Sequence, residues 1–137
     1  MKAPPRRVAG LGFRGAATAA SLRSALDKAL QVASCQCGEP VPLAALATAC
    51  DKAAAPAFTE LAAMLKLPVL AVALDRLQLQ DAAASAAVPA RYGRRSLAEA
   101  AALAGAGPGA QLLAARCVGD DGLATCAIAA IAENAGP

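Results

Sequence analysis

The chain has 137 residues, a length typical of one domain with its own hydrophobic core. Its net charge is only +3 and no more than two basic residues follow one another, so nucleic acid is not an expected partner. Aromatic residues make up 2% of the chain, which argues against a base-stacking platform and requires a core of Ala, Leu and Val. Histidine is absent, which excludes Ser-His-Asp and Cys-His catalysis and the usual zinc-hydrolase sites.

The five cysteines cannot all pair with one another, because their number is odd. Cys35 and Cys37 have the spacing C-x-C, whereas a zinc knuckle uses C-x-x-C. We therefore expect free thiols in a reducing compartment and no metal, with a redox or metal role as the alternative. No charge-free apolar stretch reaches the roughly 18 residues of a membrane span, and no signal-peptide core follows the first residues. These patterns predict a cytoplasmic protein with no membrane partner.

The first half of the chain predicts strands alternating with helices. Val8–Phe13 is a short apolar run closed by glycine, typical of a buried strand, and the apolar spacing over 16–33 predicts a helix. Residues 43–49 are apolar without a clear period: their alanines favour a helix, whereas their length and position favour a strand, which we expect. Pro56 suits the first turn of a helix, and Val69–Ala73 is the clearest strand in the sequence.

In the second half, Ser96 and Glu99 form a capping box that starts a helix running to about Ala104. Residues 110–118 and 123–128, joined by a Gly-Asp-Asp-Gly turn, predict a β-hairpin. The sequence therefore predicts one α/β domain over 1–137, with frayed tails at 1–5 and 133–137. Its expected architecture has three layers, α/β/α, around a mixed sheet of about five strands closed by a C-terminal hairpin.

Gly10, Gly12 and Gly15 spell G-x-G-x-x-G, the dinucleotide-binding fingerprint when it joins a strand to a helix. That site also needs an acidic residue at the end of the second strand, about twenty residues further on. Glu39 lies in a Gly-Glu-Pro loop and Asp51 comes too late, and no P-loop sequence is present. We therefore expect no nucleotide cofactor. The glycines instead permit tight packing and positive φ at the end of the strand.

The same turn still predicts an anion site. A helix that follows Gly15 presents unpaired N–H groups and the positive end of its dipole, and Arg14 and Lys52 add full charges. Ligands of open α/β sheets bind at the carboxyl ends of the strands, where Phe13 and Lys52 are expected. The alternative is that the glycines only make the turn.

Four segments, taken in order, resemble a family of cobalamin (vitamin B12) biosynthesis proteins that comprises CobE and the carboxyl-terminal domain of CbiG. They are VAGLGFRGAATAASLRSALDKAL, LAALATACDKAAAPAFTELAAMLKLPV, RYGRRSLAEAAALAGAG and the hairpin LLAARC with LATCAIA. The chain departs from the family pattern at Ala55, where the family often has glutamate, and at Arg116, where it often has lysine. The motif positions that match are Gly10, Gly12, Gly15, Lys52, Gly93, Ser96, Glu99 and Thr125.

The resemblance implies a protein of the aerobic cobalamin route that binds a corrin-ring intermediate, of the precorrin or hydrogenobyrinic acid type, in a cleft at the strand ends. It implies no cofactor, and it makes other pathway enzymes further candidate partners. Two alternatives remain open: a hydrolase-type or methyl-transfer accessory enzyme using Lys52, Glu99 or a cysteine, and a docking partner of a pathway methyltransferase. No catalytic constellation is visible. The expected ligand-binding residues are Gly12, Phe13, Arg14, Gly15, Lys52, Ser96 and Glu99, with Arg94 or Arg95 as further candidates.

Overall fold

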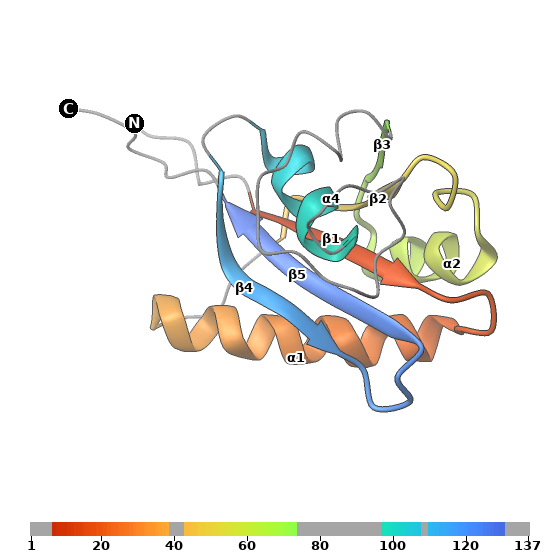
Figure 1. Ribbon diagram of the computed structural model, residues 1–137, viewed down its shortest axis with the longest axis horizontal. Coiled ribbons are helices and arrows are strands. Elements are labelled where there is room, and N and C mark those ends of the chain that lie inside the picture. Colours follow the sequence, from red (N-terminus) through yellow and green to blue (C-terminus); the bar gives the residue numbers. More distant parts are fainter. Residues whose placement is uncertain (1–6, 39–42, 74–96, 108–109, 131–137) are drawn as a thin grey trace.

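The computed structural model describes residues 7–38, 43–73, 97–107 and 110–130. Strands and helices alternate through the first half and a hairpin follows the last helix, as the sequence predicts (Figure 1). The elements are β1 (Arg7–Phe13), α1 (Ala19–Cys37), β2 (Ala45–Ala49), α2 (Pro56–Leu65), β3 (Val69–Val72), α4 (Leu97–Ala106), β4 (Gln111–Val118) and β5 (Ala124–Ala130).

Within the described ranges, five strands form one mixed sheet in the order β3-β2-β1-β5-β4. β1, β2 and β3 are parallel, whereas β5 runs antiparallel to both β1 and β4. The mixed sheet and its closing hairpin are confirmed. Residues 45–49 are a strand, and all five are buried because β2 is an inner strand covered on both faces. This double coverage explains why the segment shows no alternation of polar and apolar residues.

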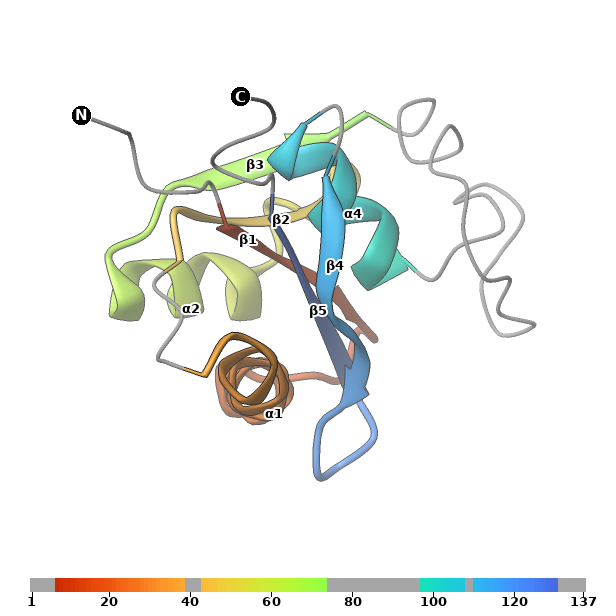
Figure 2. The same cartoon turned by 90° about the vertical axis from the view of Figure 1, so that its left-hand side faces the viewer.

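The sheet separates two hydrophobic clusters, which makes the three predicted layers. α1 and α2 cover one face and α4 covers the other (Figure 2). On the first face, Leu22 and Leu26 of α1 and Phe58 of α2 pack against Leu11 and Ile128 of the sheet. On the second face, the alanines of α4 pack against Val8, Ala45, Ala47 and Ala129.

α4 lies in direct backbone contact with β1. A Cβ atom on Gly10 would stand 2.1 Å from the carbonyl oxygen of Ala98 and 2.4 Å from the backbone nitrogen of Ala102. A Cβ on Gly105 of α4 would meet side chains of the sheet, the nearest being Val8 at 3.0 Å. Nine of the ten residues of α4 are buried, as expected for a helix that is apolar except at Glu99. Glycine at position 10 is therefore required for the spacing of these two layers.

The expectation of positive φ in the glycine motif is wrong. Positive φ occurs instead at Gly38, which caps α1, at Gly107 after α4 and at Gly122 in the hairpin turn. Gly12 makes room for a neighbour, because its Cβ would stand 3.0 Å from Oγ1 of Thr125, and a Cβ on Gly15 would meet nothing within 4 Å. Glycine is thus needed for packing at positions 10 and 12 of the motif, whereas position 15 has room for a side chain.

α1 begins at Ala19, three residues later than the sequence pattern predicts. Ala17 donates its N–H to the carbonyl of Arg14 at 3.0 Å, so residues 14–17 form a turn. Thr18 then caps the helix: its Oγ1 accepts the N–H of Ser21, whose hydroxyl accepts the N–H of Thr18. This reciprocal cap fixes the start of α1 where the alanine-rich sequence alone leaves it open.

The described helices are too short or too polar to cross a lipid bilayer.

Substituting Gly10 and Gly15 separates the two roles of the motif. We expect Gly10→Ala to lower the free energy of unfolding by about 3 kcal/mol, because the backbone of α4 must move away from β1. Gly15→Ala has open space and no positive φ, and is expected to change stability by no more than about 0.5 kcal/mol. Urea unfolding measures both. Equal stability of the two variants would contradict the proposed packing role of Gly10.

Candidate functional site

The parallel strands β1 and β2 separate before either one ends. Their pairing runs through Val8–Ala45 and Ala9–Leu46 and stops at Gly10–Ala47. β1 continues for three residues paired only with β5, and β2 continues for two residues paired only with β3. We call this place the β1–β2 fork, and define it by residues 11–13 and 48–52. The fork lies at the carboxyl ends of the strands, where ligands of open α/β sheets bind.

The last three carbonyl groups of β1 accept hydrogen bonds from side chains. The hydroxyl of Thr48 donates to the carbonyl of Leu11 at 2.7 Å, and the ammonium of Lys52 donates to the carbonyl of Phe13 at 3.0 Å. From the other neighbouring strand, the hydroxyl of Thr125 donates to the carbonyl of Gly12 at a longer 3.4 Å. Polar groups from three segments therefore gather around the end of β1.

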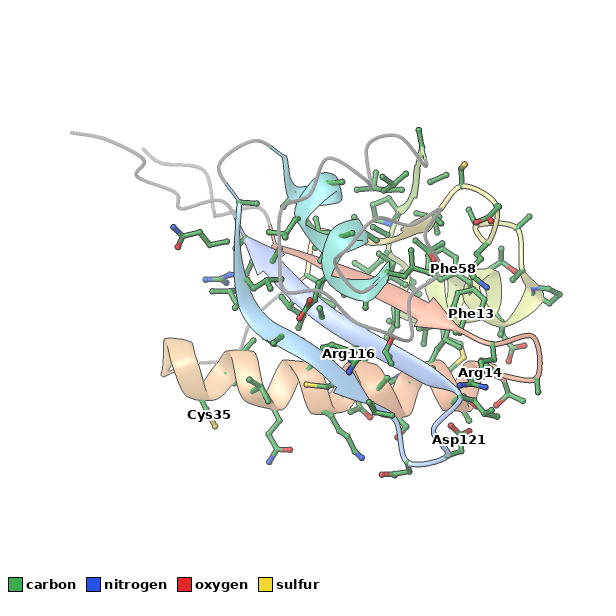
Figure 3. All side chains as sticks on the ribbon, viewed as in Figure 1. Phe13, Arg14, Cys35, Phe58, Arg116 and Asp121 are labelled. Atoms are coloured by element: carbon green, nitrogen blue, oxygen red, sulfur yellow. The ribbon has the colours of Figure 1, made fainter. Side chains whose placement is uncertain are left out.

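Lys52 is half-buried and is held over an aromatic ring. Its Nζ atom lies 5.3 Å from the centroid of the Phe13 ring, within range of a cation–π contact. Phe13 in turn stacks on Phe58 of α2, with ring centroids 6.0 Å apart, and Phe58 is fully buried. Figure 3 shows the two rings side by side at the end of β1. The bond to Phe13 uses one of three ammonium N–H groups, and no described residue accepts either of the other two.

Arg14, Gly15 and the first turn of α1 continue from this end of β1 toward solvent. Arg14 is exposed, and its backbone N–H donates to the carbonyl of Leu123 in the hairpin turn at 2.9 Å. The capping pair occupies the N–H of Ser21, but the N–H groups of Ala19 and Ala20 have no acceptor within the described ranges. This end of α1 thus has the donors and the dipole orientation of the predicted anion site.

A carboxylate of the chain itself lies at the same turn of α1. Asp121, in the β4–β5 turn, accepts a hydrogen bond from the Ser21 hydroxyl at 2.5 Å and another from the N–H of Leu123 at 3.0 Å. These bonds, that of Ser21 first, lower the pKa of Asp121. The adjacent Asp120 pairs with Lys28 of α1 at 2.7 Å, and this pairing lowers the pKa of Asp120 as well. The hairpin turn is therefore tied to α1.

The N-terminus of α4 reaches the same end of β1 from the opposite face. A Cβ on Gly12 would stand 3.5 Å from the Cβ of Leu97, the first residue of α4. In the first turn of α4, Glu99 is 9% exposed, and its carboxylate accepts the backbone N–H of Arg116 at 3.1 Å. This bond lies where the β4–β5 register shifts, between Ala114 and Cys117. Glu99 thus holds the irregular part of β4.

The predicted site residues fall into two groups on the two faces of the sheet. Phe13 and Lys52 are in contact on the α1–α2 side, and Arg14 and Gly15 follow directly in the chain. Glu99 lies on the α4 side, and Gly12 borders it through Leu97. Ser96, with Gly93, Arg94 and Arg95, lies outside the described residues, so the capping box is not placed.

Sequence reasoning missed Thr48, which the structure places inside the fork. The signal was present, because Thr48 is the only polar residue in the buried strand Ala45–Ala49, and a buried hydroxyl needs a hydrogen-bond partner. Reasoning also missed the capping role of Thr18 and the contact of Asp121. The acidic turn is visible in the sequence, but its partner Ser21 is 100 residues away.

The structure describes the side chains of four of the five cysteines. Cys35, Cys50, Cys117 and Cys126 are free thiols, as predicted, and form no disulfide with one another. Cys117 and Cys126 face each other across β4 and β5, as expected for neighbours on paired strands. Burial raises the pKa of both thiols, so neither is poised as a thiolate nucleophile. Nowhere in the described ranges do three metal-ligating side chains gather.

These features define an open, mixed α/β sheet protein with a group of polar side chains at the carboxyl ends of its parallel strands. The family model described as "Cobalamin synthesis G C-terminus" matches residues 7–129. The chain belongs to this family, and it is a protein of the cobalamin biosynthesis pathway.

Two solved structures resemble it over nearly their whole length. CobE, a protein from the cobalamin (vitamin B12) biosynthetic pathway, is 32% identical with a TM-score of 0.79, over 98% of this chain and 96% of that one. The cobalamin biosynthesis protein chiG from Agrobacterium tumefaciens str. C58 is 35% identical with a TM-score of 0.63, over 92% and 98%. No curated protein sequence gives a significant match.

The tie between the hairpin turn and α1 should weaken in acid. Because the pKa of Asp121 lies below its usual 3.8, its contribution to stability is complete above that pH and is lost as the pH falls through the lowered value. Asp121→Asn is therefore expected to lower the melting temperature at pH 7 and to lose this deficit in strong acid. Asp27→Asn is the control, because it removes an exposed carboxylate of α1 that pairs with Arg23 and does not contact the hairpin turn. A deficit for Asp121→Asn that stays constant from pH 7 to strong acid would contradict the assignment.

Proposed function

We propose that this protein binds a corrin-ring intermediate of the aerobic cobalamin route at the carboxyl ends of β1 and β2. The observation that carries the proposal is the placement of Lys52: its ammonium is fixed at the fork by Phe13 and keeps donors available. Membership of a cobalamin biosynthesis family supplies the ligand class. Intermediates of the precorrin and hydrogenobyrinic acid type carry several acetate and propionate groups around an apolar macrocycle.

The proposed contacts match that chemistry. Lys52 and Arg14 would each donate to a ligand carboxylate, and the N–H groups of Ala19 and Ala20 offer a further place for negative charge. Each charge-assisted bond would contribute roughly 1.5–3 kcal/mol where the bound ligand shields it from water. The ring of Phe13 would present an apolar surface to the macrocycle. Gly15 is exposed and leaves the backbone accessible, whereas Gly12 is buried and would act by making room for Thr125 and Leu97.

Ser96 and Glu99 belong to the proposal from the α4 side. Leu97, which lies between them in sequence, packs at Gly12, so the start of α4 reaches the same end of β1 as Phe13. A carboxylate only accepts hydrogen bonds, so Glu99 would order this side of the site through β4 while Ser96 contributes a hydroxyl.

The proposal is tested by mixing the protein with hydrogenobyrinic acid and following the visible spectrum over time, then by gel filtration of the mixture. We expect a shifted spectrum, co-elution and no further change. A spectrum that keeps changing would favour an enzyme acting on the corrin. Failure to co-elute would overturn the binding proposal, and a pull-down against the pathway methyltransferases would then test the docking alternative.

Lys52→Met is expected to weaken the binding of hydrogenobyrinic acid about 10- to 100-fold, because one charge-assisted bond is lost. Lys66→Asn is the matched control. It removes the same charge from the other end of α2, and asparagine tolerates the left-handed conformation of that residue. Absorbance titration gives both dissociation constants. Equal affinities of the two variants would rule out a specific role for Lys52.

A further inference from the structure

Thr48 takes the place of the missing β1–β2 pairing. Backbone pairing stops at Gly10–Ala47, and the next position would join Leu11 to Thr48. There the Thr48 side chain donates to the carbonyl of Leu11 at 2.7 Å. Thr48 itself stays paired with Ala71 of β3, so β2 keeps its outer partner as it leaves β1. A bond through a side chain holds two strands further apart than a direct backbone bond does.

Backbone hydrogen bonds fix the chain between Thr48 and Lys52, so the position of Thr48 determines the position of Lys52. Cys50 donates its N–H to the carbonyl of Val72 at 2.8 Å, which fixes the end of β2 to β3. Lys52 donates its N–H to the carbonyl of Ala49 at 2.9 Å and accepts the N–H of Ala55 at 3.0 Å. The backbone between Thr48 and Lys52 is therefore held at Cys50 and again at Lys52. The Lys52–Phe13 bond closes the fork two residues beyond Leu11.

We propose that Thr48 is a positioning residue, which sets the separation of β1 and β2 and thereby fixes the Lys52 ammonium over Phe13. Thr48 is fully buried, so it acts through Lys52 and does not touch a ligand. Its effect on ligand affinity rests on the proposed function. Its effect on the geometry of Lys52 does not, and this can be measured without any ligand.

The ligand-free test uses the position of Lys52 over the Phe13 ring. The ring current should shift the CεH₂ protons of Lys52 upfield of those of exposed lysines such as Lys66. Thr48→Val keeps the shape of the side chain but loses the hydroxyl, and we expect the Lys52 signal to move toward the value of the exposed lysines. Thr48→Ser keeps the hydroxyl and should retain the wild-type shift.

Ile128→Val controls for loss of stability. It removes one buried methylene from β5 in the hydrophobic cluster that contains Leu11. Ile128 pairs with Ala9, before the fork, so the Lys52 shift should stay unchanged. Thr48→Cys replaces Thr48→Val should the latter not fold, because a thiol of similar size is a weak donor. An unchanged Lys52 shift in the variant without the hydroxyl, or an equal change in Ile128→Val, would overturn the proposal.

The second test measures the affinity for hydrogenobyrinic acid. Thr48→Val is expected to weaken it about 3- to 10-fold, with Thr48→Ser close to wild type and Ile128→Val unchanged. Equal weakening in Ile128→Val would overturn the positioning role. Failure of the wild-type protein to bind would refute the proposed function alone, because the Lys52 shift still decides the role of Thr48.

Discussion

The backbone contact between α4 and β1 at Gly10 determines where the polar groups of this protein can meet. α4 runs antiparallel to β1, with Gly105 near Val8, Ala102 near Gly10 and Leu97 near Gly12. Its N-terminus therefore lies at the carboxyl end of β1. On the other face the chain leaves β1 through the turn after Phe13 and enters α1 from the same end. Two helix N-termini and the fork thus lie around one strand end.

Most of the fold could be predicted, because the length of a segment and its place between other elements indicate a strand where the spacing of apolar residues does not. Residues 45–49 illustrate this, since an apolar run that is buried on both faces has no period to distinguish a strand from a helix. The start of α1 could not be placed, because Ala16 and Ala17 favour a helix as strongly as the residues that follow Thr18. Tight packing at Gly10 could be predicted, but its partner α4 could not, because these contacts lie about ninety residues further along the chain.

One rule predicted part of the candidate site: the carboxyl ends of neighbouring parallel strands lie at the same edge of a sheet. That rule brings Lys52 near Phe13, and the two residues are in contact. The rule does not predict that the Lys52 ammonium donates to a backbone carbonyl. Nor does it predict that Thr48 separates the strands or that Asp121 lies at the start of α1. Each of these contacts joins residues far apart in sequence, and each depends on the exact spacing of packed layers.

The alanine-rich packing of α4 also shapes how the stability of this protein depends on temperature. Alanine loses no side-chain rotamer entropy when it is buried, so the contact of α4 with the sheet forms at a low cost in side-chain entropy. The same small side chains remove little apolar surface from water, and the heat-capacity change of unfolding follows that surface. A core of this kind has a flatter stability curve, with a free energy of unfolding that changes less between cold and warm conditions than in a core of large side chains.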